Sequence, residues 1–321
     1  MGKTENIVVI GGGTGLSTLL RGLKEKNVNL TAVVSVADDG GSTGRLREDY
    51  EMVAPGDIRN CMNALMPHAE AEMKEFLNHR FTSGELAGHT VGNIMLTAFA
   101  EMTDNFDEAV RIMSNMLNIS GTVLPVTNED VHISAVLDDG NVICGEHNIG
   151  TFRENGSKIL KIQMDKDAKA APGVVEAILG ADGVVIGPGS LYTSIIPNFL
   201  VSDVLEAMKK TKAKKIYICN VMTEPGETDD YTACDHLEAI ERHSYRGIAD
   251  FMIVNERYAP FDIKSRYNKE NAHTVKIDED RMDGRTKIIK GDLMLIKGEY
   301  IRHNFSRLAR AIMTVLQERN D

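Results

Sequence analysis

A glycine-rich turn near the amino terminus carries the first residues that could bind a ligand. It follows the apolar run Ile7–Ile10, whose β-branched residues suit a strand buried on both faces. Glycines leave backbone N–H groups free, and leucines at helical spacing from Leu16 to Leu23 place a helix N-terminus beside them. We therefore predict a phosphate site, although Leu16 stands where the dinucleotide fingerprint has its third glycine. The candidate contacts are Gly11, Gly12, Gly13, Thr14 and Gly15.

A second glycine-rich loop, Ala37–Gly44, leaves the apolar run Leu30–Val36 and carries two carboxylates. In dinucleotide-binding folds an acidic residue after the second strand binds the ribose hydroxyls. The same carboxylates, on Asp38 and Asp39, suit a Mg²⁺ ion that bridges to phosphate. A solvated Asp-Gly turn is the third interpretation. The candidates in this loop are Asp38, Asp39, Gly41 and Ser42.

Two further segments are typical of helix N-termini. In Pro55–Asn60 we expect Asp57 to cap its own helix, with Arg59 beside it at the edge of a cleft. The segment Gly88–Asn93 is a glycine-flanked helix opening with donors for an anion, and His89 in it is more consistent with a structural histidine. The candidate ligand contacts in these two segments are Asp57, Asn60 and Asn93.

A third glycine-rich loop follows the apolar run Gly183–Ile186. Its hydroxyl groups, on Ser190, Thr193 and Ser194, can donate to phosphate or carboxylate oxygens. Ser190 does not lie in a G-x-S-x-G elbow, so we do not predict a serine nucleophile. The run Lys215–Cys219 leads into a further polar loop. The remaining candidates, one of them just before the last helix, are Gly187, Pro188, Gly189, Ser190, Leu191, Asn220, Thr223 and Arg302.

These loops need a sheet that brings them together. Five apolar runs are typical of buried strands, and they end near Ile10, Val36, Ile186, Cys219 and Val254. In a parallel sheet the carboxyl ends of the strands share one edge, and ligands bind there where the strand order reverses. We therefore predict an α/β fold of Rossmann-like type, with a mostly parallel central sheet and helices on both faces.

The rest of the pattern predicts one domain over residues 1–321. Helical patterns without strands over about 57–118 predict a helical insertion on one side of the sheet. Short alternating runs over about 121–164 predict a small antiparallel region, with a hairpin turn at Asp138–Asn141. The apolar spacing in Asn304–Leu316 predicts a final amphipathic helix.

The composition narrows the class of partner. Lys and Arg number 36 against 47 Asp and Glu, and the net charge of −11 repels nucleic acid and anionic membrane. We find no secretion signal and no apolar run of about 20 residues, so we expect a cytoplasmic protein that does not insert in membranes. The four cysteines fit no zinc spacing, and no metal other than Mg²⁺ is suggested. The sequence is also compatible with a homo-oligomer.

Six motifs in this order resemble the CofD-like superfamily, and more closely its YvcK branch, the gluconeogenesis factors. The resemblance covers about the whole chain. The motifs are GGGTGLSTLLRGLK (11–24), ADDGGSTGRLR (37–47), PGDIRN (55–60), GHTVGN (88–93), GPGSLYTSIIPN (187–198) and NVMTEPGET (220–228).

The resemblance implies a Rossmann-like core with an inserted helical region. It also implies a cytoplasmic protein needed for growth and cell shape on gluconeogenic carbon sources, and a binder of UDP-sugars, notably UDP-N-acetylglucosamine. The related CofD enzymes use Mg²⁺ to join a phospholactate unit to a deazaflavin. This chain departs from their pattern, because it has GPGSLYTS where theirs resembles GPSNPVTS. It also has no Trp and only 5% aromatic residues to stack on a flavin.

Three functions therefore stand side by side, all with a small nucleotide as ligand. The first is a regulatory binder of a nucleoside diphosphate sugar, with the first and third glycine loops around the phosphates. In it Asp38 holds ribose hydroxyls or a metal, and Asn220 and Thr223 contact the base or sugar. The second is a CofD-type transferase in which Asp38 and Asp39 carry Mg²⁺. The third is a binder of an NAD-like dinucleotide.

Overall fold

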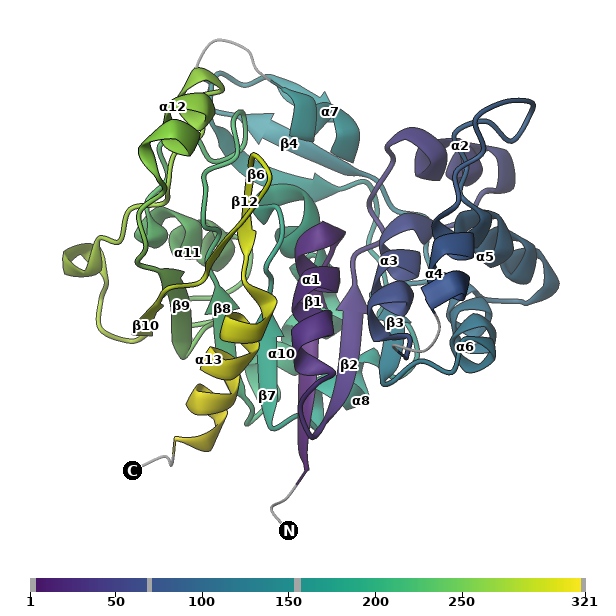
Figure 1. Cartoon of the computed structure of the whole chain (residues 1–321), viewed down its shortest axis with the longest axis horizontal. Coiled ribbons are helices and arrows are strands. Elements are labelled where there is room, and N and C mark those ends of the chain that lie inside the picture. Colours follow the sequence, from purple (N-terminus) through teal and green to yellow (C-terminus); the bar gives the residue numbers. More distant parts are fainter. Residues whose placement is uncertain (1–3, 68–70, 153–156, 319–321) are drawn as a thin grey trace.

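A seven-stranded parallel sheet forms the centre of the molecule (Figure 1). The computed structural model describes residues 4–67, 71–152 and 157–318. The strands of this sheet are β1 (Glu5–Gly11), β2 (Val28–Val34), β3 (Thr122–Pro125), β7 (Gly183–Ile186), β8 (Lys214–Ile218), β9 (Phe251–Asn255) and β10 (Lys287–Gly291).

The strand order is β10-β9-β8-β7-β1-β2-β3, and every pairing is parallel. The chain runs outward from β1 to β3, then returns to the other side of β1 and continues from β7 to β10. The order therefore reverses at β1, which pairs with β2 on one side and β7 on the other. This is the doubly wound arrangement that the sequence predicted.

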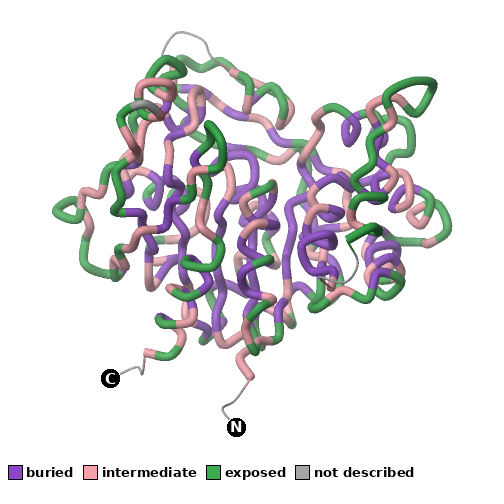
Figure 2. The backbone as a smooth tube through the Cα atoms, viewed as in Figure 1, coloured by how far each residue is buried: buried purple, intermediate pink, exposed green. Residues whose placement is uncertain are grey.

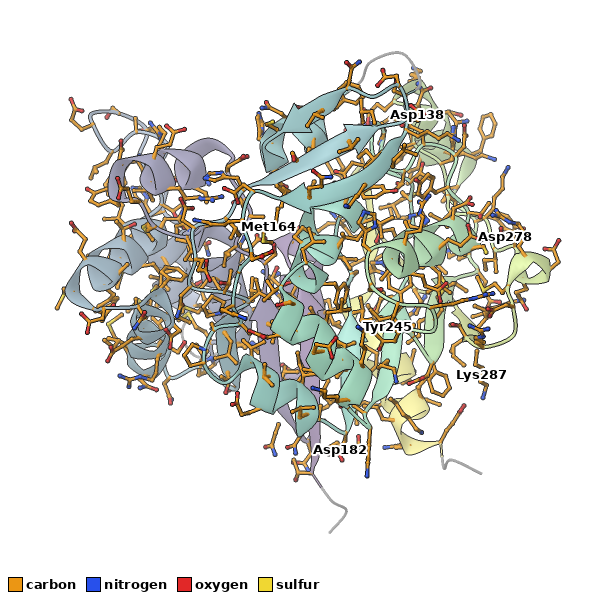
Figure 3. The ribbon with its side chains drawn as sticks, turned by 180° about the vertical axis from the view of Figure 1, so that it is seen from behind. Asp138, Met164, Asp182, Tyr245, Asp278 and Lys287 are labelled. Atoms are coloured by element: carbon orange, nitrogen blue, oxygen red, sulfur yellow. The ribbon has the colours of Figure 1, made fainter. Side chains whose placement is uncertain are left out.

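Helices cover both faces of the sheet. One face carries α1 (Gly13–Leu23) and α13 (Phe305–Gln317), which lie in front of the strands in Figure 1. The view from behind in Figure 3 shows the other face, covered by α8 (Val174–Leu179), α10 (Ser202–Lys210) and α11 (Ala233–Arg242). The central strands are buried by both layers, and Figure 2 shows them as the core of the molecule. β-Branched residues suit such two-sided burial, so Val9, Ile10, Val33 and Val185 are fully buried.

The predicted helical insertion lies between β2 and β3. It begins earlier than the expected residue 57, with α2 (Gly41–Tyr50), and continues with α3 (Pro55–Leu65), α4 (Ala71–Asn78), α5 (Val91–Met102) and α6 (Phe106–Met116). These helices gather beside the sheet at its β3 edge (Figure 1). Since α2 begins shortly after the exit of β2, the insertion starts at the carboxyl edge of the sheet.

A small antiparallel sheet lies beyond the carboxyl ends of the parallel strands. Its order is β5-β4-β6, from β4 (Ile133–Leu137), β5 (Val142–Cys144) and β6 (Ile159–Met164), and α7 (Glu146–Thr151) follows β5. In Figure 3 Asp138, in the β4–β5 turn, and Asp182, just before β7, lie at opposite ends of the molecule. The predicted hairpin at Asp138–Asn141 is confirmed, with Gly140 at φ +88°.

Two expectations about strands need correction. The antiparallel region was expected from about residue 121, but β3 pairs parallel with β2 in the main sheet, because the helical insertion returns the chain to the amino edge. The sequence pattern also missed β10 and the hairpin of β11 (Met294–Lys297) and β12 (Tyr300–His303). Most residues of these strands are exposed or partly exposed, and β10 and β11 carry lysines, so they lack the apolar signal of a buried strand.

The remaining short elements join these layers. They are a π-helical turn at Leu191–Ile195, α9 (Ile196–Phe199), α12 (Phe261–Lys269) and a 3₁₀ turn at Glu279–Arg281. In the described ranges of the chain, no helix has both the length and the apolar character to cross a bilayer.

Candidate ligand site at the carboxyl edge of the sheet

The exits of β1 and β7 lie against each other where the strand order reverses. A Cβ atom on Gly11 would lie 3.7 Å from the Gly187 Cα, and one on Gly15 would lie 2.6 Å from the Pro188 carbonyl oxygen. The second distance leaves no room for a side chain, so Gly15 lets the two loops approach. We call the contact between residues 11–15 and residues 187–190 the seam. Because α1 begins at Gly13, the positive end of its dipole lies at this seam. The structure thus brings the first and third predicted loops together.

Asp57 reaches from α3 to the start of α1. Its Oδ2 accepts a hydrogen bond from the Gly13 N–H at 2.5 Å, whereas the N-cap residue of α3 is Ala54. The expectation that Asp57 caps its own helix is therefore wrong, because its carboxyl group meets the positive end of α1 instead. The pKa of Asp57 is raised to about 6, chiefly by burial and also by the nearby Asp38 carboxylate, while the Gly13 hydrogen bond opposes the rise.

A third acidic side chain, Glu146, enters the same region from α7. Its pKa is raised to about 7, chiefly by burial and also by the charges of Asp38 and Asp39, while a hydrogen bond with Thr193 opposes the rise. Asp38 follows β2 and turns Oδ1 toward its own loop, where it accepts from the Gly40 N–H at 3.0 Å. Carboxyl groups gathered in this way favour a proton or a cation among them.

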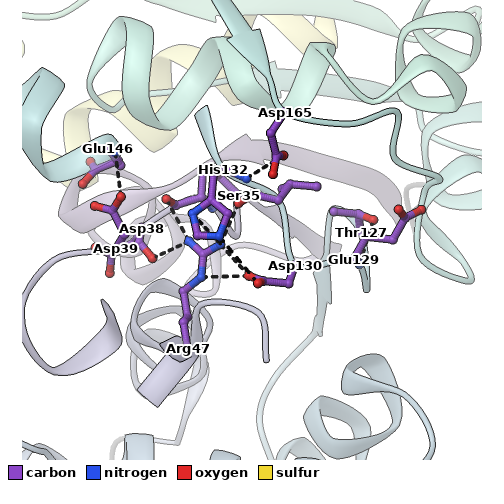
Figure 4. A network of polar contacts seen from close by, with 12 residues as sticks. Ser35, Asp38, Asp39, Arg47, Thr127, Glu129, Asp130, His132, Glu146 and Asp165 are labelled. Carbon is purple, nitrogen blue, oxygen red and sulfur yellow. Dashed lines mark hydrogen bonds and ion pairs between the residues drawn. The ribbon is translucent and has the colours of Figure 1, made fainter. Parts of the chain in front are cut away.

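Asp39 holds α7 in place. Its Oδ2 accepts from the Glu146 N–H at 3.0 Å (Figure 4). Its Oδ1 accepts from the His147 N–H at 2.7 Å. Both carboxylate oxygens are therefore engaged by the first amides of a helix, as in an N-cap. This leaves Asp38 as the more open of the two predicted carboxylates.

A buried arginine fixes the backbone that carries Asp38. The Arg47 side chain is only 2% exposed, and its Nη1 donates to the Ala37 and Asp38 carbonyl oxygens. Its Nε and Nη2 donate to Asp130 Oδ1 at 3.0 and 2.6 Å, and Nη2 also donates to the Val131 carbonyl at 2.7 Å (Figure 4). Charge-assisted bonds of this kind are strong and directional. They tie the exit of β2 to the segment that enters β4.

Other predicted residues are placed less directly on the seam. The Thr223 hydroxyl accepts from the His273 N–H at 2.9 Å, which ties it to a neighbouring segment. Leu191 is fully buried, and Asn220 lies buried just after β8. Arg302 stacks on the Tyr300 ring at 5.3 Å, and none of its contacts among the described residues joins it to the glycine loops.

The candidates in the helical insertion form a second group. Asn93 Nδ2 donates to Ser42 Oγ at 3.2 Å, and Ser42 Oγ lies 3.0 Å from His89 Nδ1. All three side chains are buried at the start of α5, so the structural interpretation of His89 fits its surroundings. Asn60 Oδ1 accepts from Arg59 Nη2 at 2.7 Å, and Gly41 is exposed at the start of α2.

Sequence reasoning missed Glu146 and the role of Arg47. Glu146 lies in the antiparallel region, where no buried strand runs into a glycine-rich loop, and the preceding Gly145 is the only local signal. Arg47 lies at the end of the motif ADDGGSTGRLR (37–47), on which the family resemblance partly depends. Its partner Asp130 is 83 residues away in the chain, so the pair becomes visible only in three dimensions.

The acidic groups do not make a metal site by themselves. Within the residues described by the structure, no three His, Cys, Asp or Glu side chains gather closely enough to hold an ion. Mg²⁺ commonly takes one or two carboxylates and completes its shell with phosphate oxygens and water. Asp38 and Asp57 fit that pattern, because their charges interact and both lie beside the seam.

Comparison with known proteins places this chain among well-defined relatives. The model of the family 2-phospho-L-lactate transferase CofD matches residues 7–294. A putative gluconeogenesis factor of Thermoanaerobacterium thermosulfurigenes is 46% identical, over 97% of this chain and 97% of its own length. The gluconeogenesis factor of Bacillus subtilis is 43% identical, over 99% of this chain and 100% of its own length.

Solved structures agree with these matches. An X-ray crystal structure of a Bacillus halodurans protein superposes with a TM-score of 0.93 at 43% identity. The match covers 97% of this chain and 100% of the other.

Proposed function

This chain belongs to the CofD family, and on that premise we propose that it is a regulatory protein that binds a nucleoside diphosphate sugar. UDP-N-acetylglucosamine is the first candidate ligand. The observation that carries the proposal is the seam between the exits of β1 and β7, which is lined by glycine on both sides and lies where the strand order reverses. Nucleotides bind at such switch points because backbone amides and helix N-termini face the phosphates there.

In this proposal the diphosphate lies along the seam. Gly12, Gly13 and Thr14 face it from one side, and Gly189 and Ser190 face it from the other. A Cβ atom on Gly189 would lie 3.1 Å from the Gly12 carbonyl oxygen, which supports a narrow seam lined by main chain. Ribose hydroxyls would then meet Asp38, and the base or sugar would extend toward Asn220 and Thr223.

The acidic groups set the conditions of binding. A diphosphate at the start of α1 would approach the Asp57 carboxylate, which already accepts from the Gly13 amide. Like charges at this distance repel, so binding needs a proton on the carboxyl group or a cation between the two. Mg²⁺ held by Asp38 and Asp57 would supply that charge. We therefore expect affinity to rise with Mg²⁺ and, in the absence of Mg²⁺, to rise as the pH falls through about 6, the pKa of Asp57.

Calorimetric titration of the purified chain with UDP-N-acetylglucosamine tests the proposal. We expect saturable binding that is tighter with Mg²⁺ than with chelator, and weakened at least about tenfold in Asp38→Asn, since a charged contact is lost. Asp203→Asn, at the start of α10, is the matched control and is expected to bind as the wild type does. Failure to bind at millimolar ligand would exclude the proposal, and tighter binding of NAD would favour the dinucleotide alternative.

The names of the relatives support a regulatory role. We propose that the ligand-bound protein acts in the cytoplasm, in growth and cell shape on gluconeogenic carbon sources. Deletion of the gene should then impair growth on such a source and leave growth on glucose intact. Complementation with Asp38→Asn should fail if ligand binding is what the cell needs.

A transferase of CofD type is the second candidate, because Asp38 and Asp57 together suit Mg²⁺ beside a phosphate. The expected result is turnover of a nucleotide-activated phosphate ester that requires Mg²⁺. Turnover that persists unchanged in Asp38→Asn would rule out this role for the carboxylate.

A further inference from the structure

Three arginines meet at the start of α5, away from the seam. Arg45 comes from α2, Arg59 from α3, and Arg80 from the segment that follows α4. They belong to three separate stretches of sequence, two of which carry motifs that the sequence analysis singled out. In a chain of net charge −11, such a gathering of cations calls for a physical explanation.

Arg45 and Arg80 converge on the turn at Gly88. Arg45 Nη2 donates to the Ala87 carbonyl at 2.7 Å, and Arg80 Nη1 donates to the Gly88 carbonyl. The φ of Gly88 is +86°, which favours glycine, and a Cβ atom there would lie 2.7 Å from Arg45 Nη2, so a larger residue would also displace the guanidinium group. The glycine lets the guanidinium group lie directly on the main chain before α5.

Arg59 approaches the first turn of α5 itself. A Cβ atom on Gly92 would lie 2.7 Å from Arg59 Cδ and 2.9 Å from its Cγ. Arg59 is only 8% exposed, and its Nη groups donate to the side-chain oxygens of Asn78 and Asn60. Its Nε, next to Cδ, is buried with no hydrogen-bond acceptor among the described residues. A buried, charged donor left in this state is costly unless a ligand or water accepts from it.

Among the residues that the structure describes, no carboxylate forms an ion pair with this cluster. Within the described ranges, Arg45, Arg59 and Arg80 contact only carbonyl and amide oxygens, and none of them forms an ion pair. Burial is the largest cause of the lowered pKa of Arg59, and the positive charge of Arg80 adds to it. Burial likewise lowers the pKa of His89, with Arg45 and Arg80 adding to the effect. The more distant acids Asp38, Asp49 and Asp57 oppose these shifts without cancelling them.

The helix α3 separates this cluster from the seam. Asp57 points from α3 to Gly13, whereas Arg59, two residues later, lies against Gly92. Residues two apart on a helix differ by about 200° around its axis, so they face opposite sides. An anion at the arginines is therefore a different one from the diphosphate proposed at the seam.

We propose that the start of α5 is a second anion site, which takes a phosphate group between Arg45, Arg59 and Arg80. Arginine suits phosphate because its planar fork donates two parallel hydrogen bonds. The Arg59 Nε supplies a further donor, and the positive end of the α5 dipole favours an anion there, although the Val91 and Asn93 amides already donate to the His79 carbonyl and to Thr90 Oγ1. The phosphate is either the free ion or the monoester of a small metabolite. This site does not depend on the function proposed above.

Calorimetry with inorganic phosphate and with methyl phosphate tests the site and separates the two sources. We expect saturable binding of at least one of them, with a Kd raised at least about tenfold in the double variant Arg45→Gln/Arg80→Gln, because two charged donors are lost. Both arginines are exposed, so the variant should fold normally. The control Arg111→Gln/Arg310→Gln removes equal charge from exposed positions elsewhere and should leave the Kd within about twofold.

A tungstate soak of wild-type crystals locates the site without any variant. An anomalous peak between Gly88 and Arg59 supports the proposal. A peak at the β1–β7 seam alone, no saturable binding, or equal Kd values in the double variant and its control would each overturn it. Titration of the double variant with UDP-N-acetylglucosamine keeps the two proposals apart, because binding at the seam should be unchanged.

Discussion

The carboxyl edge of the sheet and the start of α5 are built from the same backbone parts but carry opposite charge. Each has glycines at a tight approach and a helix N-terminus. At the sheet edge Asp57 already accepts a hydrogen bond from an amide of α1, and Asp38 and Glu146 lie nearby. At α5 the neighbours are arginines. A helix N-terminus is thus only the frame of an anion site, and the side chains around it decide whether a cation must come with the ligand.

Two helices serve both regions at once. On α2, Arg45 turns to the α5 turn while Arg47 turns to the exit of β2. On α3, Asp57 turns to α1 while Arg59 turns to α5. Each pair is two residues apart, so its members face opposite sides of a helix with about 3.6 residues per turn. The two regions are therefore mechanically linked through α2 and α3, although their ligands would be separate.

The largest expected effect is a difference in the free energy of unfolding between variants of Arg47 and Arg45. Arg47→Met should lower the free energy of unfolding by about 3 kcal/mol, the lower end for a broken buried pair, since Asp130 is partly exposed. Arg45→Met should change it by at most about 0.5 kcal/mol, because Arg45 is exposed. Urea unfolding of both variants measures the difference. Equal losses would show that the two arginines do not differ in role.

An intermediate effect is expected at the seam. Gly15→Ala places a Cβ against the Pro188 carbonyl, so we expect a loss of about 2 kcal/mol and weaker nucleotide binding. Gly150→Ala is the control, because its Cβ would have no neighbour nearer than 3.7 Å. Thermal unfolding and calorimetry measure both variants. Normal stability and affinity in Gly15→Ala would contradict the narrow seam. Phosphate binding at α5 should persist in this variant.

The smallest expected effect is a pH dependence confined to the acidic region. The pKa of Glu146 is raised from 4.5 to about 7, so the folded state holds a proton that the unfolded state releases. Its contribution to stability is complete below about pH 4.5 and is lost as the pH rises to about 7. Glu146→Gln should reduce this decline by about 1–2 kcal/mol, after allowance for partial exposure.

Urea unfolding at pH 4.5, 6 and 7.5 checks this prediction, with the exposed Glu75→Gln as control. The control should keep the wild-type decline. If Glu146→Gln also keeps it, the carboxyl groups are not coupled as described. Arg45→Gln/Arg80→Gln should keep it as well, because those arginines belong to the other region.

The sequence predicted the central fold well because its signals are local. Runs such as Ile7–Ile10 and Gly183–Ile186 are apolar on both faces, which marks parallel strands. Glycines after them mark the exits, so the meeting of Gly11 and Gly187 followed from the rule that parallel strands share one edge. Exposed strands such as β10 were missed because an edge strand needs no apolar pattern.

The sequence by itself therefore determined the buried central strands, their exits and the family, since these depend on short patterns of apolar residues and glycine. Only the tertiary structure decided which side each functional group faces. In the structure Asp57 accepts a hydrogen bond from the start of α1 and Asp39 accepts one from the start of α7, while Arg47 donates to Asp130. These pairings join residues that are distant in the chain, and each depends on how two helices or loops pack. Packing of this kind leaves no periodic trace in the sequence.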